Sequence, residues 1–158
     1  MKLLIYARQG KKGHMRPMYE TSDDLQREGS VAAIVEERWK CKLVKLPIVY
    51  HLDFAATRGA KCVAFCEVKT RNYTMQSIDQ MGGYLLSLRK WMAARDLSMA
   101  SDVPFILVVK TLDGVYYAAF HSDFLPDDLL VRGRKDRDDW QDIEPCILLK
   151  TKRFTKIA

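Results

Sequence analysis

The chain has 158 residues, of which 48% are hydrophobic and 29% are charged, values that are ordinary for one globular domain with a single core. No apolar run approaches the roughly 18 residues of a membrane-spanning helix. The apolar stretch within residues 1–6 is too short for the apolar region of a signal peptide. We therefore expect an intracellular, cytoplasmic protein that forms a single domain over residues 1–158.

The cysteines and the net charge further limit the kinds of site and partner that we expect. The four cysteines, at positions 41, 62, 66 and 146, show no Cys-x-x-Cys spacing, which argues against a zinc site, an iron–sulfur cluster or a disulfide framework. They are predicted to be reduced, and two of them alternate into a buried strand face. The net charge of +6 suits a polyanionic partner without proving one, and nucleic acid is the leading candidate.

Residues 1–20 are predicted to form a short strand and a basic arm, because residues 8–17 contain two glycines, a proline and four lysines or arginines. Such an arm either follows a phosphate backbone or is simply solvated. A helix is expected to begin near Thr21, where hydroxyl and carboxylate side chains can cap it. Its apolar positions at 31, 32, 35 and 39 share one face.

Glu28 lies three and four positions before Val31 and Ala32 and so extends the buried stripe of this helix. A carboxylate in that position needs a partner. Glu28 is therefore the candidate for an acidic site residue, and a plain surface glutamate is the alternative. Glu36 is the reserve candidate, although it falls mostly off the stripe.

A strand at residues 42–46 precedes a hairpin over residues 50–69 that turns near Gly59. Successive strand residues point to opposite faces. Leu52, Phe54 and Ala56 are expected to share an apolar face with the even-numbered residues 62–68. Asp53 then falls on the other side, as do Glu67 and Lys69.

Asp53 and Glu67 can lie side by side only if the hairpin contains an odd loop or a bulge. Two carboxylates so close repel each other in a poorly solvated site, and a hard divalent cation removes that conflict. Lys69 would point into the same pocket. The alternative is that both acids are surface residues and that Lys69 is an ordinary cross-strand ion-pair partner.

The remaining chain alternates helix and strand patterns. Residues 73–92 predict one long helix with Met75, Ile78, Leu85 and Met92 as its core stripe. Residues 104–110 are an apolar, buried strand that Asp113-Gly114 turns into a second strand at 115–120. A charged loop at 132–139 and a final strand at 145–150 complete the pattern.

The order of helix, three strands, helix and strand, together with Glu28, Asp53, Glu67, Val68 and Lys69, resembles the PD-(D/E)XK nuclease superfamily. Gln80 and Tyr84 resemble the Gln-x-x-x-Tyr motif of its RecB-like branch. Leu52 replaces the proline of the superfamily's name, and the cysteines of its iron–sulfur members are missing. The resemblance implies an α/β fold with a central mixed β-sheet flanked by helices. Its αβββαβ core would span about residues 21–110, with an added C-terminal hairpin and strand in 111–158.

The resemblance also implies site roles. Asp53, Glu67 and the Val68 carbonyl would hold one or two Mg²⁺ ions, replaceable by Mn²⁺, with help from Glu28. Lys69 would position the attacking water or stabilise the transition state. Gln80 and Tyr84 would orient active-site groups or a substrate phosphate, unless they only pack beside the sheet. Arg71 is a phosphate contact or a surface arginine.

The sequence thus predicts a metal-dependent nuclease that hydrolyses DNA phosphodiester bonds. The alternatives are a catalytically inactive nucleic-acid-binding module on the same scaffold and a protein-binding accessory factor. The small size and the lack of an obvious specificity domain argue against a sequence-specific restriction enzyme.

Overall fold

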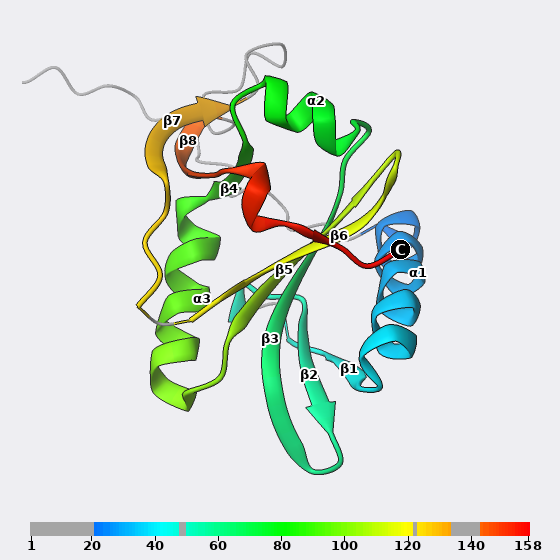
Figure 1. Ribbon diagram of the computed structural model, residues 1–158. Coiled ribbons are helices and arrows are strands. Elements are labelled where there is room, and N and C mark those ends of the chain that lie inside the picture. The colour runs from blue at the N-terminus through cyan, green and yellow to red at the C-terminus, as the bar shows by residue number, and fades with distance from the viewer. Residues whose placement is uncertain (1–20, 48–49, 122, 134–142) are drawn as a thin grey trace, which may run out of the picture.

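The computed structural model describes residues 21–47, 50–121, 123–133 and 143–158 (Figure 1). The predicted strand and basic arm of residues 1–20 lie outside these ranges, as does most of the predicted charged loop at 132–139. Within the described ranges, no helix combines the length and the apolar character that crossing a bilayer requires.

The first helix, α1 (Ser22–Trp39), begins where the sequence predicts. The Thr21 hydroxyl accepts a hydrogen bond from the Asp24 N–H, and the Asp24 carboxylate accepts one from the Thr21 N–H. This reciprocal pair satisfies two backbone donors that the first turn leaves free. The predicted core stripe is confirmed by three buried residues: Val31, Ala32 and Val35.

The main sheet of the described chain has six strands in the order β1-β2-β3-β5-β6-β9. Their bounds are Lys42–Lys45 (β1), Phe54–Arg58 (β2), Lys61–Thr70 (β3), Phe105–Thr111 (β5), Gly114–Phe120 (β6) and Thr155–Lys156 (β9). Strands β3 and β5 run parallel, whereas the other neighbours are antiparallel. The sheet is therefore mixed, as predicted.

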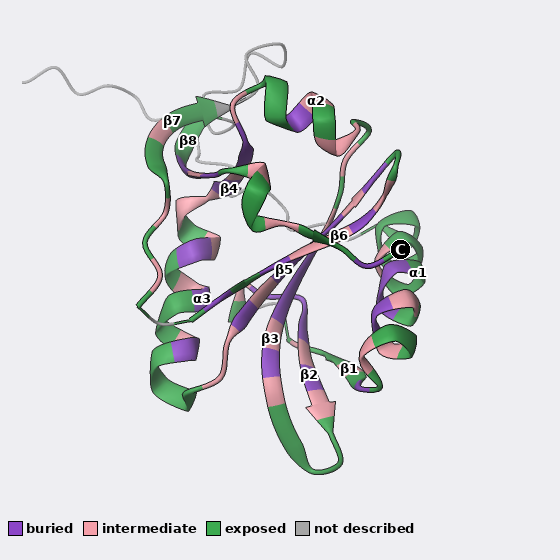
Figure 2. Ribbon diagram, viewed as in Figure 1, coloured by how far each residue is buried: buried purple, intermediate pink, exposed green. Residues whose placement is uncertain are grey.

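Helix α1 covers one face of this sheet, and helix α3 (Leu88–Ser101) lies on the other side (Figure 1). Strand β5 is buried along most of its length, and β3 is buried mainly in the part that pairs with β5 (Figure 2). Val108 belongs to the core under α1, whereas Leu107 and Val109 belong to the core that Trp91 of α3 completes. This alternation confirms the predicted buried strand at 104–110.

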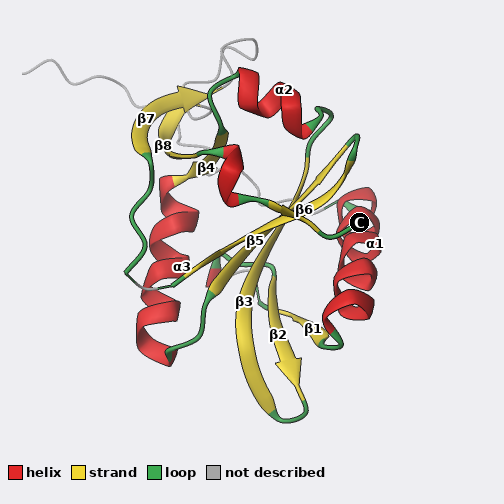
Figure 3. Cartoon of the chain, in the orientation of Figure 1, coloured by secondary structure: helices red, strands yellow, loops and turns green. Residues whose placement is uncertain are grey.

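The single helix predicted over residues 73–92 is wrong. The segment forms α2 (Met75–Gln80), strand β4 (Tyr84–Ser87) and the start of α3 (Figure 3). Gly82 and Gly83 have φ values of 99° and 137°, which lie outside the helical range, so the helix ends before them. Glycine stands at both positions because other residues rarely adopt such φ values. A Cβ on Gly83 would lie 2.6 Å from the Leu149 carbonyl oxygen. The predicted core stripe holds only in part, since Ile78 is buried and Met75 packs against the same core, whereas Met92 is exposed.

Strand β4 belongs to a second sheet of three strands, β4-β8-β7, that the sequence did not predict. The final predicted strand is β8 (Ile143–Leu149), and it pairs with β4 on one side and with β7 (Asp128–Gly133) on the other. Buried residues of β4 and β8 join the same core as Trp91. This shared core supports the proposal that the chain forms one domain.

The four cysteines are all free, but they are not all in the core. Cys41, Cys66 and Cys146 are buried, whereas Cys62 is exposed near the end of the β2–β3 hairpin. The hairpin extends beyond the cover of α1 there (Figure 1), so the expected burial of Cys62 is wrong. Burial raises the pKa of the Cys66 thiol to about 12, which makes that thiol a poor nucleophile.

Arg153 of the 3-10 helix η3 (Thr151–Arg153) binds Asp127 through hydrogen bonds of 2.7 and 2.9 Å. These bonds lower the pKa of Asp127 to about 2. The interaction is present above the unfolded pKa of about 4 and is lost as pH falls through about 2. We expect the free energy of unfolding of the wild type to fall by about 1 kcal/mol between about pH 4 and pH 2, allowing for solvent screening, when denaturation is measured at a series of pH values. Asp127→Asn should remove that part of the pH dependence.

Candidate active site

A β-bulge places Asp53 and Glu67 on the same side of the hairpin. Ala56 pairs with Ala64 but Thr57 pairs with Cys62, so Val63 is the extra residue. The turn itself has Gly59 at a φ of 58°. Of the two geometries that the sequence allowed, an odd loop or a bulge, the structure therefore has the bulge.

The expected face of Leu52 is wrong. Strand β2 begins only at Phe54, and His51, which directly precedes Leu52, has a φ of 57°. The chain is therefore not a regular strand at this point, and strand alternation does not extend back to Leu52. Leu52 packs in the core on the α3 side, whereas Phe54 packs under α1.

Asp53 is held by three hydrogen bonds to backbone groups. Its N–H donates to the Cys66 carbonyl at 3.1 Å, and its carbonyl accepts from the Leu46 N–H at 2.8 Å. Its carboxylate oxygen Oδ2 accepts from the Val68 N–H at 2.8 Å. Asp53 thus links Leu46, just after β1, to Cys66 and Val68 of β3. Its other carboxylate oxygen, Oδ1, takes no part in these three bonds and can make a further contact.

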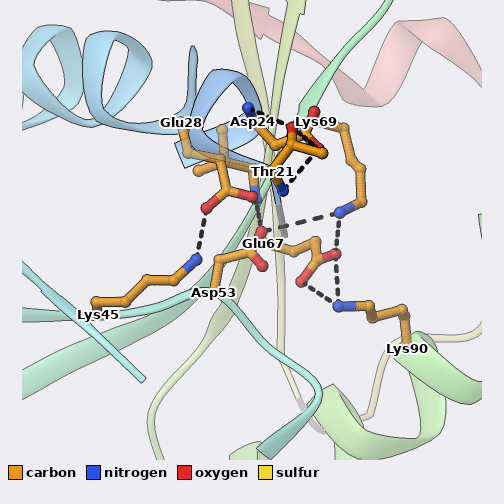
Figure 4. Close-up of polar contacts among 9 residues, drawn as sticks. Thr21, Asp24, Glu28, Lys45, Asp53, Glu67, Lys69 and Lys90 are labelled. Atoms are coloured by element: carbon orange, nitrogen blue, oxygen red, sulfur yellow. Dashed lines mark hydrogen bonds and ion pairs between the residues drawn. The ribbon is translucent and has the colours of Figure 1, made fainter. Parts of the chain in front are cut away.

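Glu67 is fully buried and is bound by two ammonium groups (Figure 4). Lys69, from the same strand, forms an ion pair with Glu67 and lies 3.9 Å from Asp53 Oδ2. Lys90, from α3, contacts both carboxylate oxygens of Glu67 at 2.9 and 3.1 Å. The two acids and Lys69 of the predicted site therefore converge.

The charges of this cluster depend on one another. Burial raises the pKa of Glu67, and the nearby Asp53 adds to that effect, whereas Lys69 and Lys90 oppose it. Burial alone would lower the pKa of Lys69, but Glu67 and Asp53 outweigh burial and raise it. Lys69 consequently remains a cation at neutral pH and can stabilise negative charge.

Glu28 lies on α1 and forms an ion pair of 2.5 Å with Lys45. Lys45 is the strand neighbour of Phe54, the residue after Asp53, so Glu28 is tied to the chain beside the site. In the view of Figure 4, Asp53 lies between the Glu28–Lys45 pair and Glu67. Glu36, the reserve candidate, instead accepts a hydrogen bond from the Leu43 N–H at 2.8 Å and joins α1 to β1.

Tyr84 lies at the start of β4 and is buried, and its hydroxyl has no hydrogen-bond partner among the described residues. Burial raises the Tyr84 pKa, and the charges of Arg71, Lys69 and Glu67 also act on it. The Arg71 guanidinium lies 5.3 Å from the centre of the Tyr84 ring. Gln80, at the exposed end of α2, is not on a common helix with Tyr84, which corrects the predicted one-turn spacing.

A family model described as "Phage putative PDDEXK endonuclease" matches residues 14–157. The chain belongs to this PD-(D/E)XK endonuclease family. Its fold is similar to that of Hjc, a Holliday junction resolvase from Archaeoglobus fulgidus, with a TM-score of 0.51 and 13% sequence identity. The similarity covers 87% of this chain and 93% of the resolvase. A search of curated proteins found no match.

Membership of the PD-(D/E)XK family confirms the superfamily resemblance and identifies the chain as a nuclease and hydrolase. Nucleases of this family generally use divalent metal ions. The site offers carboxylate oxygens of Asp53 and Glu67, which are ligands that hard cations prefer. Among the described residues, however, no group of three or more His, Cys, Asp or Glu side chains is arranged for a metal. The donor chemistry fits, but a metal ion would share Glu67 with Lys69 and Lys90.

Lys90 is the site residue that sequence reasoning missed. In the single helix predicted over residues 73–92, Lys90 falls near the C-terminal end, where nothing in the sequence connects it with Glu67. The actual helix α3 begins at Leu88, so Lys90 lies in its first turn and reaches back to β3. The consecutive glycines Gly82-Gly83 were the sequence signal for a break in the predicted helix. That break would have identified α3 as a separate helix with Lys90 near its start.

Proposed function

We propose that this PD-(D/E)XK nuclease is a Mg²⁺-dependent deoxyribonuclease. The observation that carries the proposal is the meeting of Asp53, Glu67 and Lys69 on one side of a bulged hairpin. The acids are buried and held by other groups, so their positions are set before a substrate binds. The basic chain, with a net charge of +6, also favours a polyanionic substrate.

The proposed metal ligands are Asp53, Glu67 and the Val68 carbonyl, with Glu28 contributing directly or through water. Mg²⁺ bound there would polarise the phosphoryl oxygen and lower the pKa of a bound water. Asp53 would offer the carboxylate oxygen that does not accept the Val68 N–H. Glu28 would have to exchange its contact with Lys45 for that role.

Lys69 is the proposed electrostatic catalyst. Its ammonium is protonated at neutral pH because Glu67 and Asp53 raise its pKa against the effect of burial. It would orient the attacking water and stabilise the negative charge that develops on the phosphoryl oxygens. The two carboxylates hold Lys69 in place for this purpose, so little reorganisation is needed during the reaction.

Tyr84, Arg71 and Gln80 are proposed to orient the substrate or the active-site groups. The Tyr84 hydroxyl is buried beside the charged cluster without a partner among the described residues. A buried hydroxyl generally finds a hydrogen bond, and an oxygen of the bound substrate or of its water shell would supply it. Arg71 and the exposed Gln80 would contact phosphates.

The direct test is a cleavage assay on end-labelled single-stranded, double-stranded and four-way branched DNA. The branched substrate is included because of the likeness to a Holliday junction resolvase. We expect cleavage with Mg²⁺ or Mn²⁺ and none with EDTA, since the metal supplies both the activated water and charge neutralisation. No cleavage of any of these DNAs with either metal would overturn the proposal.

A non-catalytic DNA-binding module is the alternative that such a negative result would favour. It predicts DNA binding that weakens steeply with salt, because basic residues displace counterions from phosphates. That binding would not depend on a metal ion. Binding measured at two salt concentrations with and without EDTA distinguishes it from a protein-binding accessory factor, which would bind no DNA.

A further inference from the structure

Glu67 already has two cationic partners in the structure. Lys69 comes from the same strand and also lies near Asp53, at 3.9 Å from its Oδ2. Lys90 comes from α3 and contacts only Glu67 within the cluster, through both carboxylate oxygens. Figure 4 shows the two ammonium groups meeting at this one carboxylate.

The second lysine changes the charge of the site. Asp53 and Glu67 contribute two negative charges, Lys69 contributes one positive charge, and Lys90 brings the sum to zero. Without Lys90 the cluster would carry a net negative charge that attracts a divalent cation. With Lys90 in place, a cation that approaches Glu67 meets a carboxylate whose two oxygens lie 2.9 and 3.1 Å from the Lys90 ammonium.

Glu67 and Lys90 differ in their freedom to move. Glu67 is completely buried on a central strand, whereas the Lys90 side chain is 29% exposed. A lysine side chain is long and flexible, and its ammonium is strongly hydrated outside a protein. Lys90 can therefore leave Glu67 for solvent or for a phosphate, but Glu67 cannot follow it.

We propose, building on the metal-dependent function proposed above, that Lys90 is a positioning residue that holds Glu67 in the metal-free protein and competes with the metal ion for it. Metal binding displaces Lys90 from the carboxylate. Lys69 stays, because it also faces Asp53 and belongs to the same strand as Glu67. Lys90 thus weakens metal binding by the free enzyme while it keeps the buried carboxylate oriented.

Titration calorimetry with Mn²⁺ alone tests this proposal on the wild type and on Lys90→Met. Removal of the competing cation should tighten Mn²⁺ binding by about 10-fold, within the usual range of coupling between two ligands. Lys90→Gln is a second neutral variant in case Lys90→Met does not fold, and it should also bind Mn²⁺ more tightly. Lys90→Arg retains the charge and should restore the wild-type affinity.

Arg89→Met is the matched control, because Arg89 is an exposed cation next to Lys90 on the same helix. It removes the same charge without removing the contact to Glu67, so its Mn²⁺ affinity should stay close to that of the wild type. Equal affinities for the wild type and both neutral Lys90 variants would overturn the proposal. An equal gain in Arg89→Met would also overturn it, because a general change of charge would then account for the effect.

The melting temperature gives a second readout. Lys90→Met should be less stable than the wild type without metal, because Glu67 loses one of its ion pairs. Mn²⁺ should then raise its melting temperature more than that of the wild type. DNA cleavage by the wild type together with unchanged Mn²⁺ affinity in Lys90→Met overturns only the role of Lys90. Tighter Mn²⁺ binding in Lys90→Met together with no cleavage by the wild type overturns only the nuclease function.

Discussion

Lys69→Met is expected to lower the rate of DNA cleavage about 100- to 1,000-fold, the loss typical of one electrostatic group at a reacting centre. The variant removes the cation that lies between Asp53 and Glu67 but keeps the length of the side chain. Single-turnover cleavage at saturating Mn²⁺ measures the effect on the chemical step. Saturating metal is required because the loss of Lys69 also changes the charge that a metal ion meets.

The control for this variant is Lys61→Met. Lys61 is exposed at the start of the same strand, far along β3 from the site, so its removal should leave the single-turnover rate unchanged at saturating DNA. Lys69→Arg should recover part of the rate, since it keeps the charge with a different shape. A wild-type rate in Lys69→Met would exclude Lys69 from the chemistry.

A pair of Asp53 variants should separate catalysis from folding. Asp53→Asn keeps an oxygen that can accept the Val68 N–H but loses the negative charge that a metal ligand needs. We expect its cleavage rate to fall at least about 100-fold, as for loss of an electrostatic group, with little change in the free energy of unfolding. Asp53→Ala should lose activity equally.

Asp53→Ala should in addition lose about 1–3 kcal/mol of stability, because the Val68 N–H is then left buried without its acceptor. Urea denaturation of the two variants measures this difference. Equal stability of the alanine and asparagine variants would show that the Val68 hydrogen bond contributes little. Cleavage by Asp53→Asn at the wild-type rate would exclude Asp53 as a metal ligand.

Several features of the fold could be predicted because their signals are local. The cap at Thr21 and the stripe of Val31, Ala32 and Val35 define α1 from neighbouring residues alone. The Asp113-Gly114 turn likewise joins β5 to β6. The predicted metal site required an odd loop or a bulge to bring Asp53 and Glu67 to one side, and the bulge at Val63 meets that requirement.

The structure of residues 81–87 could not be decided locally. Their apolar residues fit the spacing of a helix, and the strand that forms instead is stabilised by pairing with β8 far along the chain. A strand gains its hydrogen bonds only from such a partner, whereas a helix makes them within itself. The same tertiary arrangement separates Gln80 from Tyr84.

The sequence by itself identified the candidates for the chemistry: Asp53, just before β2, and Glu67 and Lys69, two residues apart on the same face of β3. Only the tertiary structure decided which groups surround them. It pairs Glu28 with Lys45 and brings Lys90 of α3 to both oxygens of Glu67. Strand alternation acts over a few residues and is visible in the chain, but the ion pair of Lys90 depends on how α3 packs against the sheet. No periodicity of the sequence encodes that contact.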